Sequence, residues 1–451
     1  MTVSKKGSLT ILMALTSLLF LTFCLVLAEG TRNFFFKGQA AQAMELAEFS
    51  VLSEYQQELF SYYGLFFIDL DYEQGAEHTG VLEQRAKDYF HRNAEEIAVT
   101  GLEAGNFRRA TDSGGMPFFY QAVEQMKIES GYKIFEGLFE SLGNFEEETV
   151  DLEEILEESG NAAEGILGEY VDEEGLPLFE IAIPKISFPS IGALTEAVFG
   201  SESGLSEKTV NPEERISVRD LSGGIGMKKE ISFADLQLFH GYLFRHCNYY
   251  GAENPNIWKE SMEYQLEYII SGEAGDKENL ENIMWRIFLL RTVGNYLFYH
   301  QDGEKLGKAE AKAAALVGIM GNAALVSLVK EIILISQAIE DGISETKRVF
   351  AGEKVPVYQQ GIFSGIEIGY EEYLYLFLCT AENTGKIYRM MDIAELEIRE
   401  KSGYEDFRLD HCTDSFDLQC TYQFESLFRQ IPLMDGGTYE NVVHRKIYYE
   451  M

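Results

Sequence analysis

The chain has 451 residues, of which 74 are acidic and 37 are basic, so its formal net charge at pH 7 is −37. Such a charge repels nucleic acid and anionic lipid and favours solubility, so the composition excludes nucleic acid as a partner. Aromatic residues make up 13% of the chain, which excludes a disordered polar stalk and predicts a folded protein.

The first feature along the chain is an uncharged segment from Ser8 to Ala28, preceded by Lys5 and Lys6. As a helix, its 21 residues would rise about 31 Å, which matches a bilayer core of about 30 Å. The positive-inside rule keeps both lysines in the cytoplasm and places everything after Ala28 outside. The sequence therefore predicts a single-pass protein of the cell membrane, with the lipid bilayer as its first partner. Its parts are a cytoplasmic tail over 1–7, a transmembrane helix over 8–28 and an extracytoplasmic bulk.

A secretory signal peptide is the alternative for this segment. Small residues ending at Ala28 suit signal peptidase, but an apolar core of about 7–15 residues is usual and this one is longer. Length therefore favours a retained anchor. Glu29 and Arg32 follow the segment, and we expect them at the outer membrane surface, where they could pair with partner helices.

Apolar residues continue beyond the membrane segment with helical spacing, which predicts an extracytoplasmic extension of the first helix over 29–63. The residues that step by three or four are Ala40, Met44, Ala47, Val51, Tyr55, Leu59 and Tyr62. One rod from the membrane to about Tyr63 and an anchor followed by a separate helix are both compatible with this pattern.

Three regions make up most of the remaining chain. Residues 64–171 are acidic with helical spacing, and 172–230 are rich in Pro, Gly and Ser, which is typical of a connector. Residues 231–400 return to helical periodicity and are expected to form a helical core region. Within them, Gly272 suits the C′ position of one helix and Asp276 the N-terminal cap of the next.

One stretch of the helical region, Ala311–Val329, is apolar enough to suggest a second membrane span. Lys312 and the mixed charges that close the stretch favour a buried helical hairpin instead.

The last region, 401–451, changes period. Residues from Phe416 to Phe424 alternate between apolar and polar, as do those from Val442 to Tyr448, which predicts a small antiparallel sheet. The expected fold class is therefore predominantly α with a small antiparallel β element (α+β).

Cys412 and Cys420 are the candidate disulfide among the four cysteines outside the membrane segment. If Thr413–Ser415 forms the turn of a regular hairpin, the two cysteines are offset beyond the Cα separation of about 4.4–6.8 Å that a disulfide requires. Bonding would need an open loop between them, and two free thiols are the alternative.

No sequence motif for catalysis occurs. The chain lacks Gly-x-Ser-x-Gly, His-Glu-x-x-His and Walker patterns, and its seven histidines are scattered without a Cys-x-x-Cys knuckle. We therefore expect no catalytic residue, no metal and no cofactor, and we expect the protein not to be an enzyme.

Several stretches carry a resemblance to known families. The segment from Lys5 to Arg32 resembles the N-terminus of TadE-like proteins, single-pass pseudopilins of Tad/Flp pilus systems. Nearly the whole chain resembles the uncharacterised family named domain of unknown function 5702. The stretches that carry this resemblance are YYGLFFIDLDY (62–72), LEYIISGEAGDKENL (266–280), GYEEYLYLFL (369–378) and RMMDIAELEIR (389–399).

The resemblance implies a membrane-anchored extracytoplasmic protein associated with pilus systems, and it transfers no catalytic residue. One departure concerns the early glutamate of pilin-type N-termini: Thr10-Ile11-Leu12 occupies that stretch, and Glu29 lies at the far end. This puts prepilin-type cleavage and polymerisation through a buried glutamate in doubt.

These observations favour a non-enzymatic envelope protein, structural or accessory to a Tad/Flp-like pilus or its export machinery, with protein partners in that assembly. An anchored binding module or adhesin unrelated to pili is the alternative, and an extracytoplasmic hydrolase is the least favoured interpretation.

Overall fold

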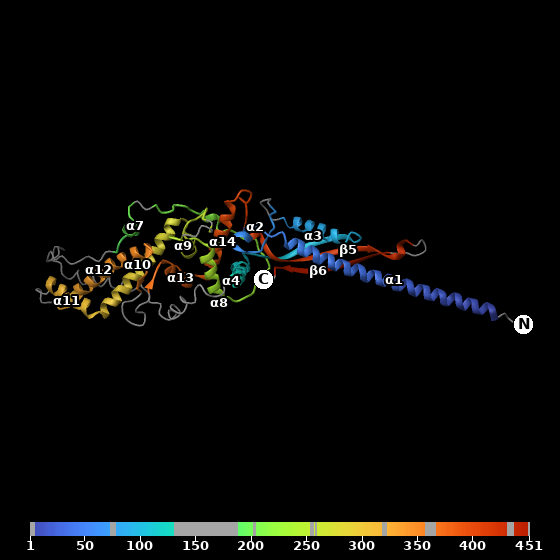
Figure 1. Ribbon diagram of the computed structural model, residues 1–451, viewed down its shortest axis with the longest axis horizontal. Coiled ribbons are helices and arrows are strands. Elements are labelled where there is room, and N and C mark those ends of the chain that lie inside the picture. Colours follow the sequence, from blue (N-terminus) through green and yellow to red (C-terminus); the bar gives the residue numbers. More distant parts are fainter. Residues whose placement is uncertain are drawn as a thin grey trace, which may run out of the picture. The chain divides into compact units, whose positions relative to one another are not determined.

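The computed structural model describes residues 5–72, 78–129, 188–201, 204–252, 257, 259–317, 323–356, 367–430 and 437–449 (Figure 1). The expected class is confirmed: helices dominate, accompanied by small antiparallel sheets. The chain divides into two compact units. Unit 1 consists of Met1–Gln125, Asp220–Ile231 and Ile398–Met451, and unit 2 of Met126–Arg219 and Ser232–Glu397.

Unit 1 begins with the longest helix, α1 (Lys5–Leu52), followed by α2 (Gln57–Tyr63), α3 (Thr79–Asn93) and the start of α4 (Asp112–Glu129). The predicted stripe on α1 is confirmed, because Ala40, Met44, Ala47 and Val51 are all fully buried. The helical extension predicted to reach residue 63 instead ends at Leu52. The side chain of Gln56 caps a new helix, which Gly64 ends in the left-handed conformation (φ +67°).

A four-stranded antiparallel sheet forms the other layer of unit 1. Its central strand β5 (Cys412–Glu425) pairs on one edge with β2 (Ala98–Arg109) and on the other with β6 (Thr438–Tyr448) and the short β1 (Ile68–Asp69). The alternation predicted for the C-terminal region is confirmed, since Phe416, Leu418, Cys420, Tyr422 and Phe424 are all buried on one face of β5.

The region predicted as helical over 64–171 also contributes strands to this sheet. β2 was missed because its glycines interrupt the alternation that identifies a strand. β1 is a short strand of two residues. Residues 130–171 of that region lie outside the described part of the chain.

α1 and α3 cover the buried face of the sheet, so the core of unit 1 lies between helices and strands. The rings of Phe36 on α1 and Phe424 on β5 have centroids 4.8 Å apart, and Phe90 on α3 lies 6.4 Å from Tyr422. The C-terminal half of α1 is thus a structural element of this unit.

Unit 2 consists mainly of helices. They are α7 (Ile191–Phe199), the 3-10 helix η2 (Pro212–Glu214), α8 (Phe233–His246), α9 (Gln265–Ser271), α10 (Asp276–Gln301), α11 (Gly303–Val317), α12 (Ala323–Phe350), α13 (Tyr370–Thr380) and α14 (Asn383–Arg399). A two-stranded sheet, β3 (Val355–Pro356) with β4 (Glu367–Ile368), precedes α13. The connector predicted over 172–230 therefore contains two short helices, and its first part lies outside the described residues.

Two further 3-10 helices, η4 (Leu409–His411) and η5 (Leu427–Gln430), flank β5 in unit 1.

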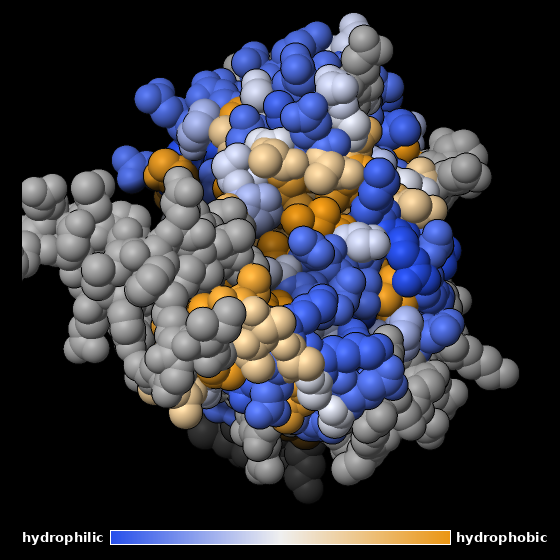
Figure 2. Space-filling model, turned by 90° about the vertical axis from the view of Figure 1, so that its left-hand side faces the viewer, coloured by the Kyte–Doolittle hydropathy of each residue, from blue (hydrophilic) through white to orange (hydrophobic). Residues whose placement is uncertain are grey.

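The apolar stretch that suggested a second span contributes to two helices that pack against each other. Ala309, Ala313 and Val317 on α11 are buried against Leu325 and Val329 on α12. Exposed charges on α11 include Lys312, and the face of the molecule at this end is largely hydrophilic with smaller hydrophobic patches (Figure 2). The predicted hairpin is confirmed as a helical pair.

Loops of unit 2 are held by buried carboxylates. Glu397 on α14 accepts hydrogen bonds from the backbone N–H groups of Glu260 and Ser261, and Asp276 at the start of α10 accepts those of Glu263 and Tyr264. Both carboxylates are fully buried. Gly272 adopts the left-handed conformation (φ +78°) predicted for it, whereas the cap of α10 is Gly275, so the side chain of Asp276 is used for the loop.

Candidate functional site: the apolar helix and its junction with the sheet

The N-terminal half of α1 has no packing partner among the described residues. Nearly all side chains from Leu9 to Ala28 are exposed, including Leu19 at 73% and Phe20 at 68%. Within unit 1 this half projects away from the other elements (Figure 1). In the described part of the chain, α1 is the one helix long and apolar enough to cross a membrane.

Polar side chains in this half bond to the helix itself. The hydroxyl of Thr16 donates to the carbonyl of Leu12 at 3.0 Å, and that of Thr22 donates to the carbonyl of Leu19 at 2.8 Å. Their hydroxyls are therefore satisfied without water, as a lipid environment requires. Lys5 and Lys6 are the first two residues of α1, at the end predicted to be cytoplasmic.

Glu29 lies where the exposed half of α1 meets the sheet. It is only 8% exposed, and its Oε2 atom accepts a hydrogen bond of 3.0 Å from the backbone N–H of Leu427, next to β5. A hydrogen bond between Glu29 and the Tyr439 hydroxyl raises the pKa of that tyrosine. The carboxylate predicted to face partner helices therefore has partners within unit 1.

Arg32 also contacts its own unit, since its guanidinium carbon lies 5.1 Å from the ring centroid of Phe36. The neighbouring Phe34 and Phe35 remain 81% and 60% exposed. Leu427, which begins η5 and binds Glu29 through its backbone N–H, is 38% exposed. The junction thus combines exposed aromatic and apolar side chains with one bound carboxylate.

The candidate disulfide between Cys412 and Cys420 does not form in this fold. Both residues are free, buried thiols on the single strand β5. Eight residues of strand separate them by about 26 Å at about 3.3 Å per residue, well beyond disulfide reach. The turn considered at Thr413–Ser415 is instead part of the continuous strand, which is why the two thiols cannot meet.

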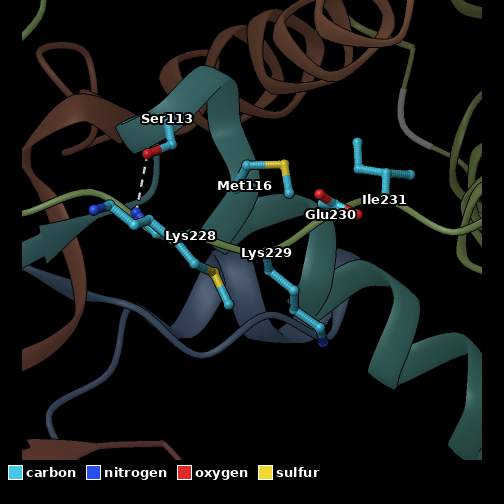
Figure 3. Close-up of a pocket in the computed structure, with 7 residues that line it drawn as sticks. Ser113, Met116, Lys228, Lys229, Glu230 and Ile231 are labelled. Carbon is cyan, nitrogen blue, oxygen red and sulfur yellow. Dashed lines mark hydrogen bonds between the residues drawn. The ribbon is translucent and has the colours of Figure 1, made fainter.

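The described residues contain no group of three or more His, Cys, Asp or Glu placed to hold a metal ion. A surface hollow of about 580 Å³ in unit 1 lies beside the start of α4 (Figure 3). Two of its polar side chains have partners within unit 1: the Ser113 hydroxyl accepts the backbone N–H of Met227, and the Lys229 ammonium lies 3.6 Å from the ring centroid of Tyr120. Among the described residues that line this hollow, the one hydrogen bond drawn is that between Ser113 and Met227.

Sequence reasoning found the residues of α1 but not their partners in the sheet. Leu427 lies 398 residues from Glu29 along the chain, and local spacing carries no information on such a contact. The isolated charge of Glu29 directly after an apolar segment was the available signal that its carboxylate would need a partner.

Comparison with known proteins gives one family. A family model described as "Family of unknown function (DUF5702)" matches residues 188–362 and 363–424. The match covers more than half of the chain, including all helices from α7 to α14 and most of β5, and it does not include α1. No curated protein and no solved structure matches the chain.

Proposed function

The chain belongs to DUF5702, a family of unknown function, and we propose that it is a non-enzymatic, membrane-anchored extracytoplasmic protein that takes part in an envelope assembly. The observation that supports this is the division of α1 into an exposed apolar half and a half that forms the core of unit 1. A bilayer would cover the first half, and the second half would link the anchor rigidly to the folded body.

The length of the exposed half supports retention in a bilayer. Ser8 to Ala28 would span about 31 Å along the helix axis, close to a bilayer core of about 30 Å. The exposed rings of Phe34 and Phe35 then lie at the outer membrane surface, where amphipathic and aromatic side chains are favoured.

A cleaved signal peptide would serve equally well to export the chain, and two observations support retention instead. Here α1 runs unbroken from Lys5 to Leu52, and Glu29 already accepts the backbone N–H of Leu427, two residues after β5 ends. We propose that the segment is kept, with Lys5 and Lys6 in the cytoplasm.

The assembly that we propose is a Tad/Flp-like pilus or its export machinery. Support comes from the resemblance of Lys5 to Arg32 to TadE-like N-termini. Because Glu29 is bound within its own chain, we propose an accessory or scaffold role rather than polymerisation through a buried glutamate.

The anchor is tested with two matched pairs of substitutions on α1. Leu15→Arg with Leu19→Arg places two charges in the proposed membrane segment, at a cost of about 3 kcal/mol each. Leu46→Arg with Phe49→Arg makes the same change at exposed positions of the other half. We expect the native chain and the second pair to resist sodium carbonate extraction and the first pair to be released.

The same preparation tests topology and cleavage. Protease added outside intact cells should remove the body, and sequencing of the mature N-terminus should find the residues before Glu29. A mature chain that begins at Glu29, or equal extraction of both pairs, would overturn the anchor.

Deletion of the protein tests the assembly: loss of pili supports the proposed role, whereas normal pili with lost surface adhesion would favour an adhesin.

A further inference from the structure

The exposed thiol of Cys379 in unit 2 interacts electrostatically with the buried side chain of Lys386. Cys379, in the last turn of α13, is exposed, whereas Cys247, Cys412 and Cys420 are buried. The remaining cysteine, Cys24, lies on the apolar half of α1. Cys379 is therefore the cysteine that a reagent in water can reach.

Lys386 on α14 provides a positive charge near this thiol. Its side chain is only 1% exposed, its Nζ atom donates to the carbonyl of Leu378 at 2.6 Å, and it lies 3.0 Å from Nε2 of His240. Burial lowers the pKa of Lys386 to about 8, so most of these ammonium groups are still protonated at pH 7.

His240 on α8 connects the ammonium to the sulfur. Burial, followed by the charge of Lys386, lowers the pKa of His240 to about 3, so the imidazole is neutral at pH 7. An ammonium only donates, so Nε2 accepts and we assign the ring proton to Nδ1. Nδ1 lies 3.9 Å from the Cys379 sulfur, where its N–H faces any negative charge on that atom.

Tyr375, a second described neighbour of the sulfur, adds no negative charge. Tyr375 on α13 donates its hydroxyl to Oε1 of Gln237, and burial raises its pKa far above neutrality. The net charge of −37 opposes a thiolate. Exposed charges more than about 8–10 Å away are largely screened at physiological salt, however, whereas the buried ammonium is screened much less.

We propose that Cys379 is a reactive surface thiol that exchanges with accessible disulfides, and that His240 and Lys386 are positioning residues that favour its thiolate. The Cys379 thiolate attacks one sulfur of a disulfide, a new S–S bond forms as the old one breaks, and the second sulfur leaves as a thiolate. No net oxidant is consumed. The proposal rests on contacts within unit 2 and does not depend on how the chain is anchored.

The first test is the pH dependence of alkylation of the full chain in detergent micelles, measured for each cysteine by mass spectrometry with iodoacetamide. An unperturbed thiol has a pKa of about 8.5, and a cationic neighbour lowers it to about 3.5–7.5. We expect the rate midpoint of Cys379 at or below about 7.5. A midpoint at or above about 8.5 would overturn the proposal. Cys247 reports on integrity, because it should stay unreactive while unit 2 is folded.

Variants separate the electrostatic role from packing. Lys386→Met removes the charge and keeps a long apolar stem, so the midpoint should rise by about one unit or more. Lys312→Met removes an exposed charge of the same unit and should leave the midpoint unchanged. His240→Gln keeps a hydrogen-bonding side chain but removes the imidazole between Lys386 and Cys379. It tests the role of His240 even if Lys386→Met makes Cys247 reactive by unfolding unit 2. Equal midpoints in native, Lys386→Met and His240→Gln chains would contradict the assignment.

The second test follows exchange itself, with oxidised glutathione as the probe at pH 7. Mixed disulfide should form at Cys379 and be absent in Cys379→Ser. Because nucleophilicity falls together with the pKa, the expected gain over a free thiol is only about three- to fivefold. The expected product is an adduct of one chain with one glutathione. A disulfide-linked pair of chains would show that the Cys379 thiolate of a second chain attacks this adduct and releases glutathione as a thiolate. A rate at or below that of a free thiol would refute the exchange function.

Discussion

Two regions of this protein are stabilised by different kinds of interior: the layer between α1, α3 and the sheet in unit 1, and the loops before α9 in unit 2. In unit 1, apolar side chains of α1 and α3 pack against one face of the sheet, and the main cluster contains apolar residues and one cysteine. In unit 2, fully buried carboxylates such as Glu397 and Asp276 accept backbone N–H groups from loops. Apolar burial depends mainly on the area removed from water, whereas each buried carboxylate depends on specific donors.

The largest expected effect concerns the carboxylate of Glu397. Its oxygens accept hydrogen bonds from Glu260, Ser261 and Gln265, so Glu397→Ala leaves several buried donors without a partner. We expect a loss of about 3–5 kcal/mol in the free energy of unfolding of unit 2. Hydrogen exchange in the full chain should show faster exchange in the loop before α9.

Glu400→Ala is the matched control for this change, because Glu400 is exposed and only three residues away. It should leave exchange in the same loop unchanged. If both variants behave alike, the buried carboxylates do not hold the loops and the contrast between the units is lost.

The corresponding test of unit 1 removes one aromatic ring from its core. Phe36 is 5% exposed and contacts Phe424, so Phe36→Ala should cost about 3 kcal/mol. Phe35→Ala removes the same ring from a position that is 60% exposed and should change the stability of unit 1 by less than about 0.5 kcal/mol. Exchange of β5 amides in the full chain measures both variants, and equal effects would refute the two-layer core.

A third prediction uses pH, because unit 2 contains a buried carboxyl whose pKa lies near neutrality. Burial raises the pKa of Glu267 to about 7 despite the hydrogen bond from Tyr370. Its pKa in the unfolded chain is about 4.5, so between about pH 4.5 and 7 the unfolded state loses the proton first. Stability of unit 2 should therefore fall as the pH rises through this window, by up to about 3 kcal/mol.

Glu267→Gln removes this titration and should flatten the pH dependence between about pH 5 and 7. Asp392, whose pKa burial raises to about 6, remains in the variant and leaves a weaker slope in the lower part of the window. Thermal unfolding at several pH values measures the difference. A native chain whose unit 2 becomes more stable from pH 5 to 7 would contradict the sign.

The same contrast explains how much of the structure the sequence could predict. The stripe from Ala40 to Val51 and the alternation from Phe416 to Phe424 follow from local periodicity, so α1 and β5 were predicted. β2 was missed because Gly101 and Gly105 break its pattern. The partners of Glu29 and Glu397 could not be predicted, since they lie 398 and 136–137 residues away in the chain.

The candidate site shows the same division. Length and hydropathy predicted the apolar half of α1 and placed Glu29 and Arg32 at its end. Only the fold shows that both residues already contact their own unit. The contacts among Cys379, His240 and Lys386 could not be predicted from the sequence either, because the three residues come from three different helices.

The smallest expected effect concerns the junction of α1 with the sheet. Glu29→Gln keeps an oxygen that can accept the N–H of Leu427 but removes the charge, so we expect a loss of about 1 kcal/mol in the stability of unit 1. Glu103→Gln makes the same change at an exposed position of β2 and should have no measurable effect. Exchange near Leu427 and carbonate extraction, measured on the same sample, separate two roles for Glu29. A contact within the chain predicts faster exchange with unchanged membrane retention and unchanged cross-linking to neighbours. Lost cross-linking with unchanged exchange would instead show that this carboxylate serves a partner helix, and α1 would then join the assembly through its charged junction as well as through its apolar half.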